Sequence, residues 1–310
     1  MSKYLIGAGG WAYFQVPGIH PLVAYSNAFD FVEVNSTFYE IPNLKLVESW
    51  RKLVPPNFEF AVRCNKALTY KHKFQPTPEA FEVFKKMVTL CSTLKAEILH
   101  LQTPATFQPT KSNVELIRNF FSSTDFRGIR IALEMRGAKQ PLNSNLRTTM
   151  QDYNMIHCVD LSRDEEPAYK SDIIYSRLFG KGPHNISQPT DEQLREIDRK
   201  ASKENHKKVA VSFHFVKMYK DAARFKIYRQ TGKFPTVTNS TGIGSLKEVL
   251  REDAKFPSNT KELIRHQGWK LIDLTEDKRI HASHMLKKLP EKTYNSINEI
   301  VQTLESLKPW

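Results

Sequence analysis

Hydrophobic and polar positions alternate along the first two thirds of the chain, as short apolar runs separated by longer amphipathic stretches. The apolar runs are rich in β-branched residues and have the length of buried strands. They lie at residues 4–7, 31–34, 58–63, 97–102, 130–135, 155–159, 173–178 and 208–213. Stretches with the period of amphipathic helices lie between them, as at 44–53, 78–94, 113–123 and 190–204. The pattern predicts eight strands that alternate with helical crossovers.

This alternation predicts an α/β fold, a closed parallel TIM-type (β/α)8 barrel. An open doubly wound sheet is the alternative. The run GAGGWAY argues against it, because Ala12 stands where the dinucleotide-binding motif G-x-G-x-x-G needs its third glycine. After residue 225 the rhythm changes to a turn region, short helical stretches and an apolar run at 269–274. We therefore expect a barrel over residues 1–225 and a C-terminal helical extension over 226–310, packed on the barrel.

The run FVEVNSTFYE at residues 31–40 places a carboxylate, Glu33, inside an apolar strand. Period-two alternation puts Glu33 and Asn35 on one side of this strand, and Glu134 and Arg136 on one side of the fifth strand. The carboxyl ends of barrel strands form the active face, so both glutamates are expected to face one cavity. A buried acid must be paired, and Arg63, Arg136 and Arg177 are the available partners. The glutamates are therefore either structural salt bridges or catalytic carboxylates.

Two loops after predicted strands add positive charge to the same face. The segment SRLFGKGPHN at 176–185 surrounds Lys181 with glycines after Arg177, which suits a phosphate site or an ordinary glycine turn. The segment RCNKALTYKHK at 63–73 interleaves basic residues with Tyr70. It suits a nucleic-acid strand or a phosphosugar, and a solvated charged loop is the alternative.

Metal chemistry finds little support in the residue pattern. The ten histidines form no H-x-H or H-E-x-x-H pair, and the three cysteines lie far apart. His100 and His157, within strands, are interpreted as core imidazoles, whereas His214 follows the last strand and is a functional candidate. We predict reduced, buried thiols and no metal, and the sequence identifies no cofactor.

The chain carries a formal net charge of +13 at pH 7, spread along its length. Such charge favours an anionic small molecule or nucleic acid as partner, although ordinary surface charge is the alternative. No apolar run approaches the roughly 18 residues of a membrane span, and the start has no signal-peptide pattern. We expect a soluble cytoplasmic protein without a membrane partner, of unspecified oligomeric state.

These motifs together resemble the YecE-like family, also called domain of unknown function 72. The similarity runs over about residues 4–225 through GAGGWAYF (7–14), FVEVNSTFYEIP (31–42), PPNFEFAVRCNKALTYKHK (55–73), LHLQTPATF (99–107), IALEMR (131–136) and YSRLFGKG (175–182). It implies a TIM-type barrel in an intracellular protein and supplies no reaction. The residues at the family's motif positions, which the resemblance implies line a shared pocket, are Trp11, Tyr13, Glu33, Asn35, Thr37, Phe38, Tyr39, Gln102, Glu134 and Arg136.

The chain departs from that family's pattern at two positions. Gly137 and Phe179 stand where the family usually has histidines, which argues against a histidine-dependent mechanism. The tail, including MYKDAARF at 218–225, resembles extensions on archaeal members.

Two functions are compatible with these residues. The first is an enzyme that hydrolyses phosphoester or glycosidic bonds in a phosphorylated or nucleic-acid substrate, with Glu134 as general acid or base, Arg136 orienting it and Glu33 as the second carboxylate. Its predicted substrate-binding residues are Trp11, Tyr13, Asn35, Thr37, Arg63, Lys66, Gln102, Arg177, Lys181 and His214. The second is a non-catalytic nucleic-acid-binding protein that uses the basic barrel rim.

Overall fold

The computed structural model describes residues 2–136, 138, 141–163 and 165–307. These residues form two compact units. The first comprises residues 2–179, 199–214 and 218–223, and the second comprises 180–198, 215–217 and 224–307.

The first unit is built on a sheet of eight parallel strands within the described residues, in the order β6-β5-β4-β3-β2-β1-β8-β7. The strands are β1 (Lys3–Ala8), β2 (Phe31–Val34), β3 (Glu59–Arg63), β4 (Ile98–Gln102), β5 (Arg130–Glu134), β6 (Ile156–His157), β7 (Ile173–Leu178) and β8 (Lys208–Phe213). A parallel bridge between Val159 and Ser176 joins the two ends of the sheet. The sheet is therefore a nearly closed barrel, and the predicted TIM-type fold is confirmed.

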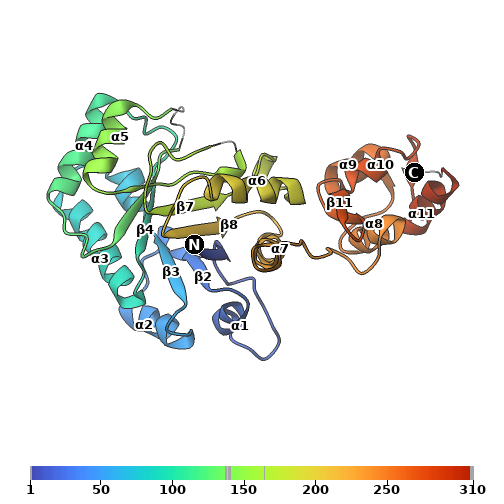
Figure 1. Cartoon of the computed structure of the whole chain (residues 1–310), viewed down its shortest axis with the longest axis horizontal. Coiled ribbons are helices and arrows are strands. Elements are labelled where there is room, and N and C mark those ends of the chain that lie inside the picture. The colour runs from blue at the N-terminus through green and yellow to red at the C-terminus, as the bar shows by residue number, and fades with distance from the viewer. Residues whose placement is uncertain (1, 137, 139–140, 164, 308–310) are drawn as a thin grey trace. The chain divides into compact units, whose positions relative to one another are not determined.

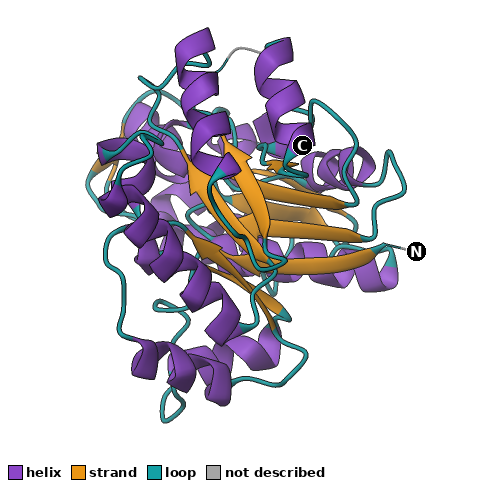
Figure 2. Cartoon of the chain, turned by 90° about the vertical axis from the view of Figure 1, so that its left-hand side faces the viewer, coloured by secondary structure: helices purple, strands orange, loops and turns teal. Residues whose placement is uncertain are grey.

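Helices fill the connections and lie outside the strands (Figure 1, Figure 2). They are α1 (Pro21–Ala28), α2 (Leu44–Leu53), α3 (Pro78–Leu94), α4 (Lys111–Ser122) and α5 (Ser144–Asp152). Two further helices, α6 (Asp191–Ala201) and α7 (Met218–Thr231), each take residues from both units. Side chains that precede several of them accept the first free amides, as Asn43 does from Leu46 (2.9 Å) and Thr77 from Ala80 (3.3 Å). Across the described ranges, no helix combines the length and the apolar character that a membrane crossing requires.

The barrel interior is layered by the two-residue period of its strands. A buried cluster takes at least one residue from every strand. Its members are Leu5, Phe31, Ala61, Ile98, Ala132, Ile156, Cys158, Ile173, Tyr175 and Ala210. Two residues further along the strands, the inward positions become Glu33, Arg63, His100, Glu134, Arg177 and Ser212. An apolar layer therefore lies beneath a polar layer that faces the carboxyl ends of the strands.

The second unit has its own core around two short antiparallel pairs. β10 (Leu271–Thr275) pairs with β11 (Lys278–His281), and β9 (Ser258–Asn259) pairs with β12 (Thr293–Tyr294). Its helices include α8 (Gly242–Arg251), α9 (Thr260–Gln267), α10 (Ser283–Leu286) and α11 (Ile297–Ser306). The apolar run predicted at 269–274 is mostly β10, and the turn region predicted at 238–245 already contains the start of α8.

β1 approaches β2 closely at Gly7. In the register of the two strands Gly7 lies opposite Phe31, and a β-carbon at Gly7 would overlap the Phe31 carbonyl oxygen and lie 2.7 Å from Tyr25 Oη. That Tyr25 hydroxyl accepts from the Ala8 amide (2.7 Å) and donates to the Phe31 carbonyl (2.9 Å). The two strands therefore have no room for a side chain at position 7.

We expect Gly7→Ala to lower the free energy of unfolding by about 2–4 kcal/mol, because backbone atoms would have to move. Gly18→Ala is the control. Nothing lies within 4 Å of a β-carbon at Gly18, whose φ of +77° makes alanine cost about 1 kcal/mol. Urea unfolding followed by circular dichroism measures both losses, and equal losses would contradict this account of Gly7.

Candidate active site

One guanidinium joins the two predicted carboxylates. Arg177, on β7, is only 2% exposed. Its Nε and Nη2 donate to Glu33 Oε2 (2.8 Å) and Oε1 (3.0 Å), and its Nη1 donates to Glu134 Oε2 (2.8 Å). The structure thus brings residues of β2, β5 and β7 together in the polar layer of the barrel.

Glu33 is completely buried. Tyr175 donates its hydroxyl to Oε2, and His214 Nε2 lies 3.6 Å from Oε1. Burial alone would raise the pKa of Glu33, but Arg177 and the nearby imidazoles hold that pKa well below its ordinary value. Glu33 is therefore an ionised, enclosed partner of Arg177. The catalytic role expected for Glu33 from the sequence stays a prediction, and the observed contacts are those of a structural partner of Arg177.

Glu134 keeps 17% of its side chain exposed. Besides Arg177, it accepts from His100 Nε2 at Oε2 and from Arg136 Nε at Oε1, both at 3.0 Å. Burial raises the pKa of Glu134, but Arg177, His100 and Arg136 together lower it well below its ordinary value. The carboxylate is therefore ionised at neutral pH and has no proton to donate as a general acid.

His100 is neutral at neutral pH and acts as a donor to Glu134. Burial, followed by the charge of Arg177, lowers the pKa of His100 to about 4. A neutral imidazole that donates through Nε2 carries no proton on Nδ1, and this Nδ1 has no partner among the described residues. His100 is buried, as the sequence predicted. Its ring also orients Glu134 through the hydrogen bond from Nε2.

Amide groups extend the polar layer around Arg63. This side chain, 6% exposed, donates to Asn35 Oδ1 (2.5 Å) and to Gln102 Oε1 (2.9 Å). Arg177 Nη1 donates to the same Gln102 oxygen (3.0 Å). The guanidinium of Arg63 also lies 3.7 Å from the ring centroid of Phe38. The arginines are thus held by both charge and hydrogen bonds.

Exposed aromatic and basic residues follow the strand ends. Tyr13 is 83% exposed and Tyr39 is 65% exposed, with Lys66 Nζ 5.7 Å from the Tyr39 ring centroid. Trp11 packs edge-on against Trp50 at 5.3 Å between ring centroids. These loops follow β1, β2 and β3, so the rim offers ring faces beside positive charge.

Three other predicted binding residues have different surroundings. Thr37 is buried and donates to the carbonyls of Val34 (2.8 Å) and Arg63 (2.6 Å), so it fastens a loop. His214 Nε2 lies 3.0 Å from Ser212 Oγ at the end of β8. Lys181 belongs to the second unit.

Of the two positions where the chain departs from the family pattern, the structure describes only Phe179. Gly137 lies outside the described residues. The Phe179 ring stacks on His214, with centroids 4.6 Å apart, and lies 5.0 Å from the Arg177 guanidinium. Its amide donates to Asp160 Oδ2 (3.0 Å), while Oδ1 accepts from the Ser162 amide (3.0 Å). Burial raises the pKa of Asp160 to about 6. Its two carboxylate oxygens bond to backbone amides of different loops, so Asp160 connects these loops.

Sequence reasoning missed Tyr175 as a hydrogen-bond partner of Glu33 and Tyr70 as a hydrogen-bond partner of Gln102. Tyr175 lies in an apolar run, but it shares a strand face with Arg177, and that spacing was a usable signal. Tyr70 lies in a single π-helical turn, Ala67–Lys71, where no strand or helix period applies.

A metal is a poor fit to the one cluster of suitable ligands found among the described residues. His100, Glu134 and Cys158 bring ligand atoms within 4.8 Å of one another. However, Arg177 already contacts the Glu134 oxygen, and burial raises the pKa of the Cys158 thiol well above its ordinary value. A divalent cation there would meet a guanidinium and a protonated thiol.

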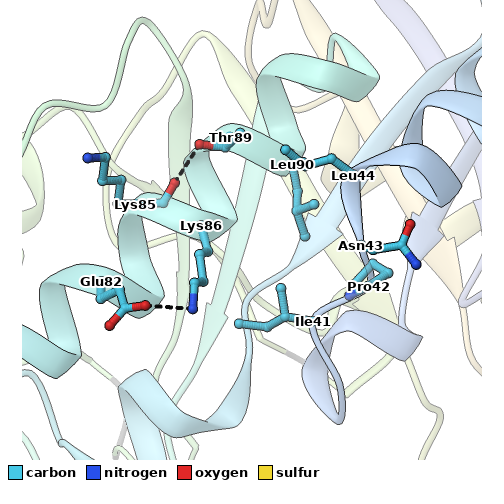
Figure 3. A pocket seen from close by; sticks show the side chains of 9 residues that line it. All are labelled: Ile41, Pro42, Asn43, Leu44, Glu82, Lys85, Lys86, Thr89 and Leu90. Carbon is cyan, nitrogen blue, oxygen red and sulfur yellow. Dashed lines mark hydrogen bonds and ion pairs between the residues drawn. The ribbon is translucent and has the colours of Figure 1, made fainter.

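A pocket of about 560 Å³ lies away from this cluster, on the outer wall beside α3 (Figure 3). Ile41, Leu44 and Leu90 form apolar walls, and Lys86 pairs with Glu82 (2.6 Å). It holds none of the carboxylate–arginine groups of the barrel interior. The strand-end cluster and this pocket are therefore separate features of the barrel.

The charges at the strand ends favour an anion. The guanidiniums of Arg63, Arg136 and Arg177 outnumber the carboxylates of Glu33 and Glu134 by one. Burial lowers the pKa of both His100 and His214, so the imidazoles add no positive charge at neutral pH. The cluster keeps one net positive charge, to which Lys66 adds another at the rim.

Arg177→Leu should lower the free energy of unfolding at pH 7 by about 3–5 kcal/mol, because it leaves Glu33 buried and unpaired. Without the guanidinium, burial raises the pKa of Glu33, so the variant gains stability when that carboxylate takes up a proton. The wild type, whose Glu33 pKa is depressed, instead loses stability as pH falls below about 4.5. The difference in the free energy of unfolding between wild type and Arg177→Leu should therefore become smaller from pH 7 towards pH 4, as measured by urea titrations. Arg136→Leu, at a side chain 43% exposed, should cost less than about 1 kcal/mol, and an equal loss would contradict the central role of Arg177.

The stability of the wild type should decline as pH is lowered from 6.5 to 4. Burial lowers the pKa of His157 to about 4, as it does for His100, so the unfolded chain binds more protons in this window. Each imidazole contributes a slope of at most about 1.4 kcal/mol per pH unit. His157→Gln should reduce the slope in this window, whereas His266→Gln, at an exposed position of α9, should preserve it. An unchanged slope in His157→Gln would show that this imidazole is protonated in the folded state.

Comparisons with known proteins agree with this barrel. The family model described as "Protein of unknown function DUF72" matches residues 5–231. The UPF0759 protein YunF of Bacillus subtilis (strain 168) is 30% identical over 171 residues, a match that covers 50% of this chain and 59% of that protein, less than two thirds of its length. A solved DUF72 family structure from Enterococcus faecalis V583 has a TM-score of 0.58 at 19% identity and covers 74% of this chain and 98% of that one. Another, from Thermotoga maritima MSB8, has a TM-score of 0.57 at 16% identity and covers 73% and 99%. Because the family model matches well over half of its length, the chain belongs to the DUF72 family.

Proposed function

We propose that the strand-end cluster binds an anionic, phosphorylated substrate and hydrolyses a phosphoester bond in it. Glu134 would take a proton from the attacking water, whose oxygen forms a new bond to phosphorus while the phosphoester P–O bond breaks. The leaving alcohol would take its proton from solvent, and Arg136 would hold the phosphoryl group. The observation that carries this proposal is the state of Glu134. It is ionised, partly exposed and held by Arg177, His100 and Arg136, the last of which is itself exposed.

The pKa shifts favour phosphoester over glycosidic hydrolysis. Cleavage of a glycosidic bond by two carboxyl groups needs one that stays protonated to deliver a proton to the leaving group. Here the pKa values of Glu33 and Glu134 are both depressed, and Glu33 is closed to solvent. Phosphoryl transfer depends more on positioning and on stabilising negative charge, which guanidiniums provide.

Substrate binding would also make Glu134 a stronger base. In the free protein its depressed pKa makes it a weak proton acceptor. Arg177 is the main cause of the lowering, followed by His100 and then by Arg136, which bonds to Oε1. A phosphoryl group that engages Arg136 would draw that guanidinium from the carboxylate and raise the pKa of Glu134. Arg177, fixed by Glu33 from below, would keep the carboxylate in place.

The rim suggests a substrate with a ring. Exposed Tyr13 and Tyr39 offer faces for stacking, and Lys66 lies beside Tyr39. A nucleotide or a single nucleic-acid strand combines such a ring with a phosphoester. Three buried free cysteines suit a reducing compartment, so we place this activity in the cytoplasm.

The same rim supports a second candidate, a nucleic-acid-binding protein without catalysis. Exposed tyrosines beside Lys66 are sufficient to bind a single strand without Glu134. Its affinity for an oligonucleotide should fall steeply with salt, and replacing Glu134 should not weaken it.

Glu134→Gln should reduce the hydrolysis of bis(4-nitrophenyl) phosphate by at least about 100-fold, because it removes the base. Binding of a single-stranded oligonucleotide, measured by fluorescence anisotropy, should remain. The control is Glu40→Gln, an exposed glutamate of the loop after β2, which should keep full turnover. Equal turnover in wild type and Glu134→Gln would refute the base assignment. Binding without turnover in the wild type would favour the second candidate.

A further inference from the structure

Tyr70 presents a hydroxyl group to the strand-end cluster. It lies in the π-helical turn after β3, is partly exposed, and packs its ring edge-on against Phe38 at 5.4 Å between centroids. Its hydroxyl oxygen accepts a hydrogen bond of 2.8 Å from Gln102 Nε2. Because Gln102 is the donor in this bond, the Tyr70 hydroxyl proton is not used in it.

Two guanidiniums fix the orientation of the Gln102 amide. Arg63 Nη2 and Arg177 Nη1 both donate to Gln102 Oε1, at 2.9 and 3.0 Å. Rotating the amide by 180° would set its NH2 group against these donors, so the observed orientation is the favoured one. Gln102 Nε2 must therefore donate to Tyr70. The tyrosine oxygen is the acceptor, and its own proton points elsewhere.

That proton has no acceptor among the residues that the structure describes. Three other tyrosines of the same unit differ, since Tyr25, Tyr153 and Tyr169 donate to the backbone carbonyls of Phe31, Arg118 and Met155 at 2.8–3.0 Å. Those hydroxyls fasten the fold. The Tyr70 hydroxyl is oriented by a network of charged groups and left with a proton to donate.

We propose that Tyr70 donates a hydrogen bond to an anionic oxygen of the bound substrate, which makes it a further substrate-contacting residue of this site. The chain of donors runs from Arg177 through Gln102 to Tyr70, and each bond polarises the next, so the last O–H is a strong donor. A phosphoryl oxygen is the ligand chemistry that suits it, because Arg63 and Arg177, which both bond to the Gln102 amide, supply positive charge on the same hydrogen-bond network. The inference rests on the proposed function for its substrate class, but its geometric basis is independent of Glu134 chemistry.

Inorganic phosphate is the probe that tests this proposal on the full-length protein. Isothermal titration calorimetry of the wild type, Tyr70→Phe and Tyr153→Phe compares the loss of two tyrosine hydroxyls. We expect Tyr70→Phe to bind phosphate about tenfold more weakly, because a hydrogen bond to a charged group is lost. Tyr153→Phe, which loses a hydroxyl that bonds to a backbone carbonyl, should bind phosphate like the wild type.

A second measurement separates hydrogen-bond donation from a structural role. With 3-fluorotyrosine at position 70, the more acidic phenol is a stronger donor and should bind phosphate more tightly than the wild type at pH 6. If Tyr70 only supported Gln102 as an acceptor, the fluorinated ring would accept more weakly and would not tighten phosphate binding. This replacement keeps the hydroxyl, so it also serves if Tyr70→Phe folds poorly.

The outcomes distinguish this inference from the proposed function. Unchanged phosphate affinity in Tyr70→Phe, with the wild type binding, would overturn the role of Tyr70 and leave the anion site in place. Failure of the wild type to bind phosphate would overturn both. Weaker phosphate binding in Tyr70→Phe, together with undiminished hydrolysis in Glu134→Gln, would support Tyr70 and overturn the base assigned in the proposed function.

Discussion

The buried guanidinium of Arg177 is the constraint on which the barrel interior depends. A charge removed from water must be paired and hydrogen-bonded, and Arg177 meets this requirement through Glu33, Glu134 and Gln102. The dependence is mutual. Glu33 is a stable anion in a closed interior because the guanidinium, with the imidazoles of His214 and His100, outweighs the effect of burial on its pKa. Each of these groups would be unfavourable alone, and together they form one electrostatic unit.

The layering of the barrel separates this unit from the apolar core. Inward positions such as Phe31, Ala132 and Tyr175 fill the interior, and the next inward positions two residues later are Glu33, Glu134 and Arg177. A step of two residues along a strand therefore leads from the apolar core to the charged cluster. Within the polar layer, Glu33 is completely buried and Glu134 keeps 17% of its side chain exposed, so that one positions the arginine and the other remains open to solvent. Two glutamates of similar sequence context thereby acquire different roles in the proposed mechanism.

Much of the fold could be predicted from the residue pattern because parallel barrel strands are buried on both faces. Continuous apolar runs marked all eight strands, although β6 has only two residues, Ile156–His157, where five were predicted. The pairing of Glu33 with an arginine also followed from the sequence, since a buried acid requires a partner. The choice of Arg177 among three arginines did not follow, because it depends on which strands lie across the barrel from one another.

The sequence by itself determined the alternation of strands and helices, the face on which the polar residues gather and the need to pair the buried acids. These are local properties, set by side-chain period and by the cost of burying charge. Only the tertiary structure decided that Glu33 is enclosed while Glu134 stays partly open, and that Gln102 turns its amide towards Tyr70. Those outcomes depend on distances between residues far apart in the chain. Barrel closure sets these distances, and no local pattern encodes them.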